Sequence, residues 1–300
     1  MADRRLQVFH AVAKHLSFTR AADALFMTQP AVTFQIKQLE EQYGTRLFER
    51  RHGSILLTPA GEVVLSYAEK ILALSDEMDT RLSEMTGEMR GPLLVGASTT
   101  IAEFMLPRVL GEFNALYPQV RARLIVANSE SIEGRVAELT LDVGMIEMPA
   151  KLSGLTSQIC CEDELQVICM PDYPLAEFAK LCPNDLVDYE FISREPGSGT
   201  KEITDSYFRQ HGIAPERLKT QMELGSPEAL KGVVSTGLGF AIVSRAVVAK
   251  ENRLGELLSI PLDPPLKRNL YLVHPKDRFQ SKLVATFVDF ARRKLKEQAE

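Results

Sequence analysis

Residues 17–57 constrain the fold more than any other part of this 300-residue chain. Apolar residues recur at helical spacing over 18–25 and again over 29–42, with a short turn at Phe26-Met27 between them. A hairpin pattern follows over 48–57, with Gly53 suited to its turn. Two short helices around a tight turn, followed by a hairpin, predict a winged helix-turn-helix, which places one helix in the DNA major groove.

Side chains at the predicted helix ends support these boundaries. Ser17 and Thr28 are suitable N-caps, and Pro30 falls in a first turn, where its missing N–H costs nothing. Gly44 is suited to a C-cap. Apolar residues also recur through 1–14, which predicts a further helix before the motif.

The segment 29–42 is the predicted recognition helix. Gln pairs with adenine, Thr contacts the thymine methyl, and Lys or Arg meets phosphate. The candidate DNA-binding residues are therefore Thr28, Gln29, Pro30, Thr33, Gln35 and Lys37 in the helix region, and Arg50 and Arg51 in the wing. The plainer alternative is a polar helix surface beside a charged hairpin, but the wing and the helix after it favour DNA binding.

Five short motifs carry a resemblance to a known family. They are Phe18-Thr19-Arg20-Ala21-Ala22, Thr28-Gln29-Pro30-Ala31-Val32, Gln35-Ile36-Lys37-Gln38-Leu39-Glu40, Leu47-Phe48-Glu49-Arg50 and Leu57-Thr58-Pro59-Ala60-Gly61. The chain resembles a LysR-type transcriptional regulator. The family pattern often has serine and arginine where this chain has Thr33 and Phe34. Phe34 loses a phosphate contact, so the operator sequence cannot be copied from relatives.

Charge is unevenly distributed along the chain. Residues 1–58 hold eight Lys and Arg against five Asp and Glu, a net +3, so the total of −5 leaves −8 for the rest. Only the N-terminal part is suited to a polyanion. Met1-Ala2-Asp3-Arg4-Arg5 precedes no long apolar run, and no stretch is apolar enough to cross a membrane, so we expect a cytoplasmic protein.

The four cysteines and five histidines show no metal-binding spacing. Cys160, Cys161, Cys169 and Cys182 lack a CxxC pattern and are expected to be small apolar residues in a reducing cytosol. A thiol sensor at the adjacent pair Cys160-Cys161 stays open as an alternative. We expect no metal, no cofactor and no catalytic residue.

A long helix is predicted over 59–89. Its apolar residues recur every three or four positions, at Val64, Tyr67, Ile71, Leu74, Met78, Leu82, Met85 and Met89. A small winged domain cannot bury such a seam alone, so the seam predicts a partner helix, and in the family this linker helix pairs two subunits. The alternative is a single helix lying on its own domain.

Strands and helices alternate after a break at Gly91-Pro92. Strands are predicted over 93–97, 120–126, 141–146, 165–170, 191–193, 221–224, 239–243 and 270–273, and helices over 101–113, 131–139, 200–211, 227–236 and 280–296. This order predicts an α/β domain with a parallel sheet. The predicted fold class is an α/β C-terminal domain with an all-α winged helix-turn-helix N-terminal domain and a long linker helix.

The resemblance implies that the C-terminal domain is two-lobed and periplasmic-binding-protein-like, with a ligand between its lobes. The tail would complete the first lobe through crossovers near Glu162-Asp163 and Pro264-Pro265. The expected domains are a DNA-binding domain at 1–58, a linker helix at 59–90 and an effector-binding domain at 91–300. Lobe I takes about 91–161 and 267–300, and lobe II about 162–266.

Small polar residues gather after three predicted strands, where open α/β sheets bind ligands. Glycines and hydroxyls in 197–200 suit an anion, and Arg194 suits bidentate recognition of a carboxylate or oxyanion. The candidate effector-binding residues are Ser98, Thr99, Thr100, Glu147, Arg194, Glu195, Gly197, Ser198, Gly199, Thr200 and Ser226. The alternative is helix capping at each junction, with Arg194 in a salt bridge to Glu147 or Glu195.

The runs 141–147 and 195–200 are similar to the family branch that regulates carbon fixation and sulfur metabolism. This likeness implies a small anionic effector, with sulfur oxyanions among the candidates. The leading hypothesis is a transcription regulator that binds a pseudo-palindromic operator in double-stranded DNA as a homodimer or homotetramer, with RNA polymerase as a further candidate partner. A transport module is disfavoured by the N-terminal motif, and an enzyme by the lack of a histidine near Ser98 or Ser198.

Overall fold

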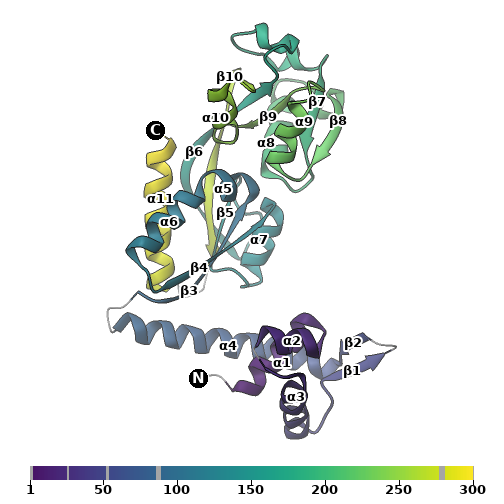
Figure 1. Ribbon diagram of the computed structural model, residues 1–300, viewed down its shortest axis with the longest axis vertical. Helices are drawn as coiled ribbons and strands as arrows, with labels where there is room; N and C mark the ends of the chain where they lie inside the picture. Colours follow the sequence, from purple (N-terminus) through teal and green to yellow (C-terminus); the bar gives the residue numbers. More distant parts are fainter. Residues whose placement is uncertain (1–2, 26, 52–53, 86–88, 277–280, 300) are drawn as a thin grey trace. The chain divides into compact units, whose positions relative to one another are not determined.

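The computed structural model describes residues 3–25, 27–51, 54–85, 89–276 and 281–299 (Figure 1). The chain divides into two compact units, Met1–Glu88 and Met89–Glu300. Each unit encloses its own clusters of buried apolar side chains, which is the property of separate domains. No helix in the described part of the chain is long and apolar enough to cross a membrane.

The N-terminal unit is a winged helix-turn-helix, as predicted. Its elements are the helices α1 Arg4–His15, α2 Phe18–Ala24 and α3 Gln29–Tyr43, and the hairpin strands β1 Phe48–Arg51 and β2 Ser54–Leu57. The Ser17 and Thr28 hydroxyls accept hydrogen bonds from amides in the first turns of α2 and α3. Gly44 ends α3 at φ +65°. The expected turn residues Phe26 and Gly53 lie outside the described residues.

The long helix α4, Pro59–Met85, begins at a Thr58 cap, where the Gly61 amide donates to the Thr58 hydroxyl over 3.0 Å. Its first turns pack Val64 and Ala68 against the N-terminal core. By contrast, four apolar side chains on another side of the helix are 44–64% exposed: Tyr67, Ile71, Leu74 and Met78. The predicted end at Met89 was wrong, because Met89 is not helical and packs against the core of the second unit. The Leu82 and Met85 side chains lie outside the described part.

A six-stranded sheet of order β4-β3-β5-β10-β6-β9 forms the frame of the second unit. Its strands are β3 Gly91–Ser98, β4 Val120–Ala127, β5 Val143–Ile146, β6 Leu155–Cys169, β9 Ala241–Ser244 and β10 Leu258–Pro275. The pairs of β3 with β4 and β5 are parallel, whereas β10 and β6 pair antiparallel with each other and with β5 and β9. The prediction of a parallel sheet was therefore wrong for three of its five strand pairs, because strand patterns do not encode direction.

The long pair β6 and β10 joins two groups of elements. The first group holds β3 to β5 with α5 Thr99–Phe104, α6 Leu106–Leu116, α7 Ser129–Ala137 and α11 Lys282–Ala299. The second holds β9 and the parallel pair β7 Glu190–Arg194 and β8 Lys219–Leu224, with α8 Gly199–Gln210, α9 Pro227–Val234 and α10 Arg245–Leu254. Short 3₁₀ helices lie at Pro174–Glu177, Pro183–Leu186 and Pro215–Arg217. The C-terminal α11 returns to pack on α6 and β6 (Figure 1).

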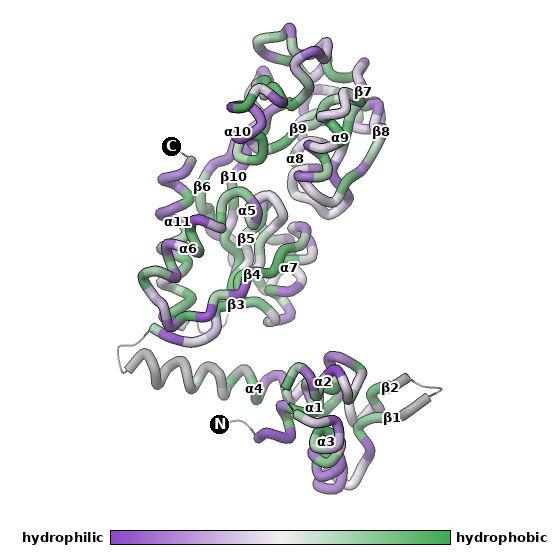
Figure 2. Tube along the Cα trace, in the orientation of Figure 1, coloured by the Kyte–Doolittle hydropathy of each residue, from purple (hydrophilic) through white to green (hydrophobic). Residues whose placement is uncertain are grey.

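The predicted helices differ from the structure at two further places. The single helix expected over 101–113 is broken at Met105, because Pro107, in the first turn of α6, has no N–H to continue the earlier helix. Helix α10 was not predicted, since Val247 and Val248 are its only buried residues and give no helical period. Hydrophobic stretches such as β9 and α9 lie inside the second group of elements (Figure 2).

Candidate functional site

The predicted DNA-contacting residues lie on the outer face of α3. Val32, Ile36 and Leu39 turn the opposite face into the core, which leaves Gln29 and Lys37 exposed. The Gln29 side-chain amide donates to the Thr33 hydroxyl over 3.1 Å, and that hydroxyl donates to the Gln29 carbonyl over 3.0 Å. These bonds hold two candidate base-contacting groups together at the start of the helix. Thr28 and Pro30 are also exposed, and Gln35 is half-buried.

Phe34 lies on this same exposed face. Its side chain is 57% exposed, although it is large and apolar, and its neighbours one turn away are Pro30 and Lys37. In the wing, the backbone of Arg50 pairs with Ile55 and that of Arg51 with Ser54. Their side chains lie outside the described part of the structure, so their DNA contacts stay a prediction.

A buried polar cluster lies in the second unit, around the Glu147 carboxylate that follows β5. Its Oε1 accepts a hydrogen bond from Ser98 Oγ, at the end of β3, over 2.8 Å. Its Oε2 accepts a hydrogen bond from the Ser129 hydroxyl, in the first turn of α7. All three side chains are buried. The ends of two parallel strands and one helix thus meet at a single carboxylate.

Arg268 of β10 extends the cluster to the second group of elements. Its Nε donates to Asp163 Oδ2 of β6 over 2.8 Å, and its Nη1 donates to Thr200 Oγ1 of α8 over 2.9 Å. The same Nη1 lies 3.9 Å from Glu147 Oε1. The Ser244 hydroxyl donates to Asp163 Oδ1 over 2.7 Å. Arg268 Nη2 is buried and has no hydrogen-bond partner within the described chain.

Gly199, the first residue of α8, packs directly on Glu147. A Cβ at this position would lie 2.8 Å from Glu147 Cβ and from Oε2, which real Cβ atoms do not tolerate. Gly197, at φ +82°, accepts a hydrogen bond from the Glu130 amide over 3.4 Å. Ser198 is buried at the N-cap position but makes no side-chain capping bond. The positive end of the α8 dipole therefore faces a carboxylate.

Arg194 forms the centre of a neighbouring group. Its Nε donates to Glu195 over 2.8 Å, and its Nη2 donates to the Thr99 hydroxyl over 3.0 Å. The guanidinium also donates to the carbonyls of Leu224 and Gly225. Its internal salt bridge is thus with Glu195, and no bond between Arg194 and Glu147 occurs among the described contacts.

The helix-capping alternative holds at only one of the three junctions. Ser226 accepts a hydrogen bond from the Ala229 amide over 3.5 Å and so caps α9. Thr100 is buried inside α5, whose N-cap is Ser98 without a side-chain capping bond. The hydroxyls of Ser98 and Thr200 are bonded within the buried cluster instead.

Sequence reasoning missed Ser129, Asp163 and Arg268. Asp163 and Arg268 stand 105 residues apart, in polar stretches of long strands that lack an apolar period. They meet because β6 and β10 pair with Arg268 opposite Asp163. Only the register of these two strands, which cannot be derived from the sequence, could have revealed that Asp163 and Arg268 form a pair.

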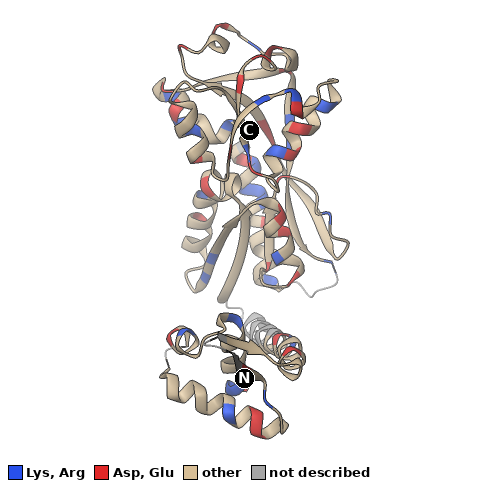
Figure 3. Ribbon diagram, turned by 90° about the vertical axis from the view of Figure 1, so that its right-hand side faces the viewer, with Lys and Arg blue, Asp and Glu red and all other residues tan. Residues whose placement is uncertain are grey.

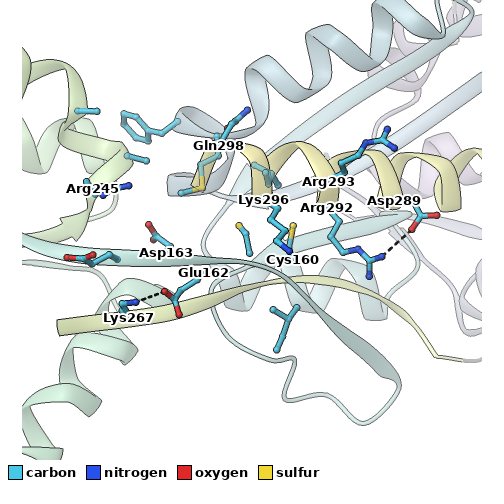
Figure 4. A pocket seen from close by; sticks show the side chains of 18 residues that line it. Cys160, Glu162, Asp163, Arg245, Lys267, Asp289, Arg292, Arg293, Lys296 and Gln298 are labelled. Atoms are coloured by element: carbon cyan, nitrogen blue, oxygen red, sulfur yellow. Dashed lines mark hydrogen bonds and ion pairs between the residues drawn. The ribbon is translucent and has the colours of Figure 1, made fainter. Parts of the chain in front are cut away.

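A pocket lies near Cys160, Cys161 and Asp163 and is bounded by side chains of α10 and α11 (Figure 4).

Acidic and basic residues are interspersed along the helices of this unit rather than separated by sign (Figure 3). The described residues contain no group of three His, Cys, Asp or Glu side chains placed to hold a metal ion.

An exposed recognition helix on one unit and a buried polar cluster in a two-part α/β unit define a DNA-binding regulator with an effector-binding domain. The chain belongs to the LysR family: residues 4–62 match "Bacterial regulatory helix-turn-helix protein, lysR family" and residues 86–296 match "LysR substrate binding domain". LysR regulators bind DNA and effector ligands and form oligomers, and they are not enzymes. The predicted family and class of function are therefore confirmed.

Known relatives place the chain near regulators of carbon fixation. It is 38% identical to a probable RuBisCO transcriptional regulator of Cyanidioschyzon merolae, over 94% of this chain and 95% of that protein. The Synechocystis PCC6803 CcmR regulatory domain in complex with 2-PG is 30% identical, with a TM-score of 0.63 over 70% of this chain and 98% of that one. Full-length CbnR with its target DNA shares the fold, at 24% identity and a TM-score of 0.68 over 98% and 100% of the two chains.

Proposed function

We propose that this chain regulates transcription in response to a small anion bound at the buried polar cluster, between lobe I at about 91–161 and 267–300 and lobe II at about 162–266. The observation that carries the proposal is the unpartnered Nη2 of Arg268. A buried donor without a partner costs about 1–3 kcal/mol. An oxyanion accepted there would remove that cost and gain a charge-assisted hydrogen bond.

The effector class that fits best is a small anion with both a phosphate and a carboxylate. The site has two buried guanidinium groups: Arg268 lies in the Glu147 cluster, and Arg194 lies beside it, bonded to Thr99. The N-terminus of α8 adds partial positive charge beside them. 2-Phosphoglycolate, the anion bound by the related CcmR domain, has this chemistry.

The effector competes with an internal anion. Glu147 already holds the hydroxyls of Ser98 and Ser129, so an incoming anion displaces this carboxylate or shares its donors. Gly199 packs against the same carboxylate, so displacement of Glu147 also changes how α8 sits on the first group of elements. A ligand shifts the arrangement of the lobes only as far as it prefers one arrangement.

The output of the switch is DNA binding. We propose that α4 pairs two chains through Tyr67, Ile71, Leu74 and Met78, so that two α3 helices meet a pseudo-palindromic operator with half-sites about 34 Å apart. The proposed targets are genes of carbon fixation, in keeping with the relatives' names. We place this activity in the cytoplasm, with RNA polymerase as a downstream partner and a homodimer or homotetramer as the working form.

Titration calorimetry of the full chain tests the effector site. The panel is 2-phosphoglycolate, phosphate, sulfate, sulfite and thiosulfate, with Arg268→Lys and Thr200→Val beside the wild type and Ser226→Ala as the matched control at a capping residue. We expect micromolar binding of 2-phosphoglycolate, which both cluster variants weaken and the control keeps. Heat from no anion, or equal binding by all four proteins, would overturn the proposal.

A further inference from the structure

Strand β6 contains a bulge at its two adjacent cysteines. Cys161 pairs with Leu270 of β10, and the next pair joins Ile159 to Tyr271, so Cys160 is an extra residue without a partner. Neighbouring side chains of a regular strand point to opposite faces, and a bulge breaks this alternation. Ile159 is 56% exposed, whereas Cys160 and Cys161 are both buried in the same apolar cluster.

The bulge brings the two thiols into contact. Cys160 and Cys161 are neighbours in sequence and are buried in the same apolar cluster, so their thiols interact. The interaction with the Cys160 thiol lowers the pKa of Cys161, while the interaction with Cys161 and burial raise the pKa of Cys160. One sulfur of the pair is therefore the better nucleophile, and the other keeps its proton beside it.

Both cysteines line the pocket shown in Figure 4. Arg292 and Lys296 of α11 reach into it above Cys160. Its other basic residues are Arg245, Lys267 and Arg293, and its acidic residues are Glu162, Asp163, Glu164 and Asp289. Lys267 is paired with Glu162. Arg292 is paired with Asp289 over 4.0 Å. The positive charge that favours the Cys161 thiolate, the reactive form, is the Arg268 guanidinium, and the Asp163 carboxylate opposes it.

We propose that Cys160 and Cys161 form a reversible disulfide with each other and that a small peroxide is the oxidant. Cys161 thiolate attacks one peroxide oxygen, the O–O bond breaks, and the released oxygen leaves as water after taking a proton. Cys160 sulfur then attacks the Cys161 sulfenic acid; the S–S bond forms, the S–O bond breaks, and the hydroxyl leaves as water with the Cys160 proton. The two thiols lose two electrons, and these reduce hydrogen peroxide to two waters.

Burial selects the oxidant. Cys160 and Cys161 are only 5% and 7% exposed, so a peroxide reaches them more readily than a peptide-sized disulfide does. Adjacent Cα atoms are about 3.8 Å apart, closer than the usual 4.4–6.8 Å across a disulfide. A bond made under such strain is easily reduced, which suits a regulatory disulfide.

The disulfide would form two residues before Asp163. Asp163 holds Arg268, and Arg268 holds Thr200. Contraction of the bulge to an S–S length of about 2.05 Å moves this strand segment. Resting on the proposed function, we expect oxidation to weaken effector binding about tenfold.

Mass spectrometry of the full chain after hydrogen peroxide treatment tests the disulfide without effector or DNA. We expect the wild type to lose two hydrogen atoms, to regain them with dithiothreitol, and to yield a peptide with Cys160 and Cys161 joined. Cys160→Ser should stop at a Cys161 sulfenic acid that dimedone traps. Cys182→Ser, at the exposed cysteine, is the control and should respond as the wild type does.

Two results would overturn the proposal: intact thiols at Cys160 and Cys161 under conditions that oxidise Cys182, or cross-linked chains in place of the internal bond. Effector calorimetry on the oxidised protein is the second arm. A disulfide with unchanged effector affinity would refute the coupling through Asp163 alone. An absent effector response in both redox states, with the disulfide formed, would count against the proposed function and not against the thiol chemistry.

Discussion

Arg268 Nη1 donates a hydrogen bond to Thr200 Oγ1 over 2.9 Å and so joins β10, near the middle of the sheet, to the first turn of α8. The same guanidinium holds Asp163 over 2.8 Å. The Arg268 side chain therefore connects β10 and β6, the long strands shared by both groups of elements, with α8, the helix that packs on Glu147. This connection is the structural basis of the proposed effector switch.

Replacement of Arg268 by Met should cost about 3–5 kcal/mol of unfolding free energy in the regulatory unit, because it leaves the Asp163 carboxylate buried without its cation. Urea unfolding at neutral pH measures the loss. The double variant Arg268→Met/Asp163→Leu should recover most of it, since the unpaired charge is gone. A loss below about 1 kcal/mol in the single variant would mean that the pair is not the link described.

Replacement of Gly199 by Ala should cost about 1–3 kcal/mol and weaken effector binding, because the new methyl group would collide with Glu147. Gly232→Ala is the matched control: it also lies in a helix, and its Cβ would meet no atom within 4 Å. The control should be neutral or stabilising by up to about 1 kcal/mol. Equal stability of the two variants, measured by thermal and urea unfolding, would refute the close contact.

Much of this arrangement could be predicted from local sequence. The caps at Ser17 and Thr28 and the alternation of strands and helices each depend on residues close in sequence, so they can be recognised there. The pairing of Arg268 with Asp163 depends on the register of two long strands that the sequence showed only in part. The bulge at Cys160 likewise arises from pairing with β10, which no local pattern reveals.

Phe34 stands where the family pattern often has arginine, so we expect it to change which DNA sequence the chain prefers. Its exposed ring on the outer face of α3 suits apolar contact with a thymine methyl. For an operator selected from random duplexes, replacement of that thymine by uracil should cost the wild type about 0.8 kcal/mol, or about fourfold in Kd. Phe34→Ala should show no such loss at that position in fluorescence anisotropy.

Lys37→Ala is the control for this comparison. Its expected effect is weaker binding to every sequence and a salt slope reduced by about one, because a lysine contacts phosphate rather than a base. If Phe34→Ala retains the full thymine preference at every operator position, the ring reads no methyl group.

The exposed seam of α4 should hold two chains together. Leu74→Glu places a charge in the apolar stripe that includes Tyr67 and Met78, and should convert oligomers to monomers in sedimentation velocity. Ser66→Glu, exposed on the same helix but off the stripe, should leave the oligomer intact. An unchanged sedimentation coefficient for Leu74→Glu would place the subunit contact elsewhere.

His10 should make the N-terminal unit sensitive to acid. Burial lowers the pKa of His10 below its usual 6.5. The unfolded chain therefore binds this proton more readily, so stability is complete above pH 6.5 and falls as the pH drops below it. His10→Gln should flatten the pH dependence of thermal unfolding between about pH 5 and 7. His15→Gln, on the same helix, should keep it, and an unchanged slope in His10→Gln would contradict the assignment.

The central claim is that an anion at the Glu147–Arg268 cluster controls DNA binding. The most direct measurement is the Kd of the full chain for its selected operator, with and without saturating 2-phosphoglycolate, in wild type and Thr200→Val. We predict a change of about 5–150-fold in the wild type and a much smaller one in the variant. An operator Kd that no anion of the panel changes would contradict the claim.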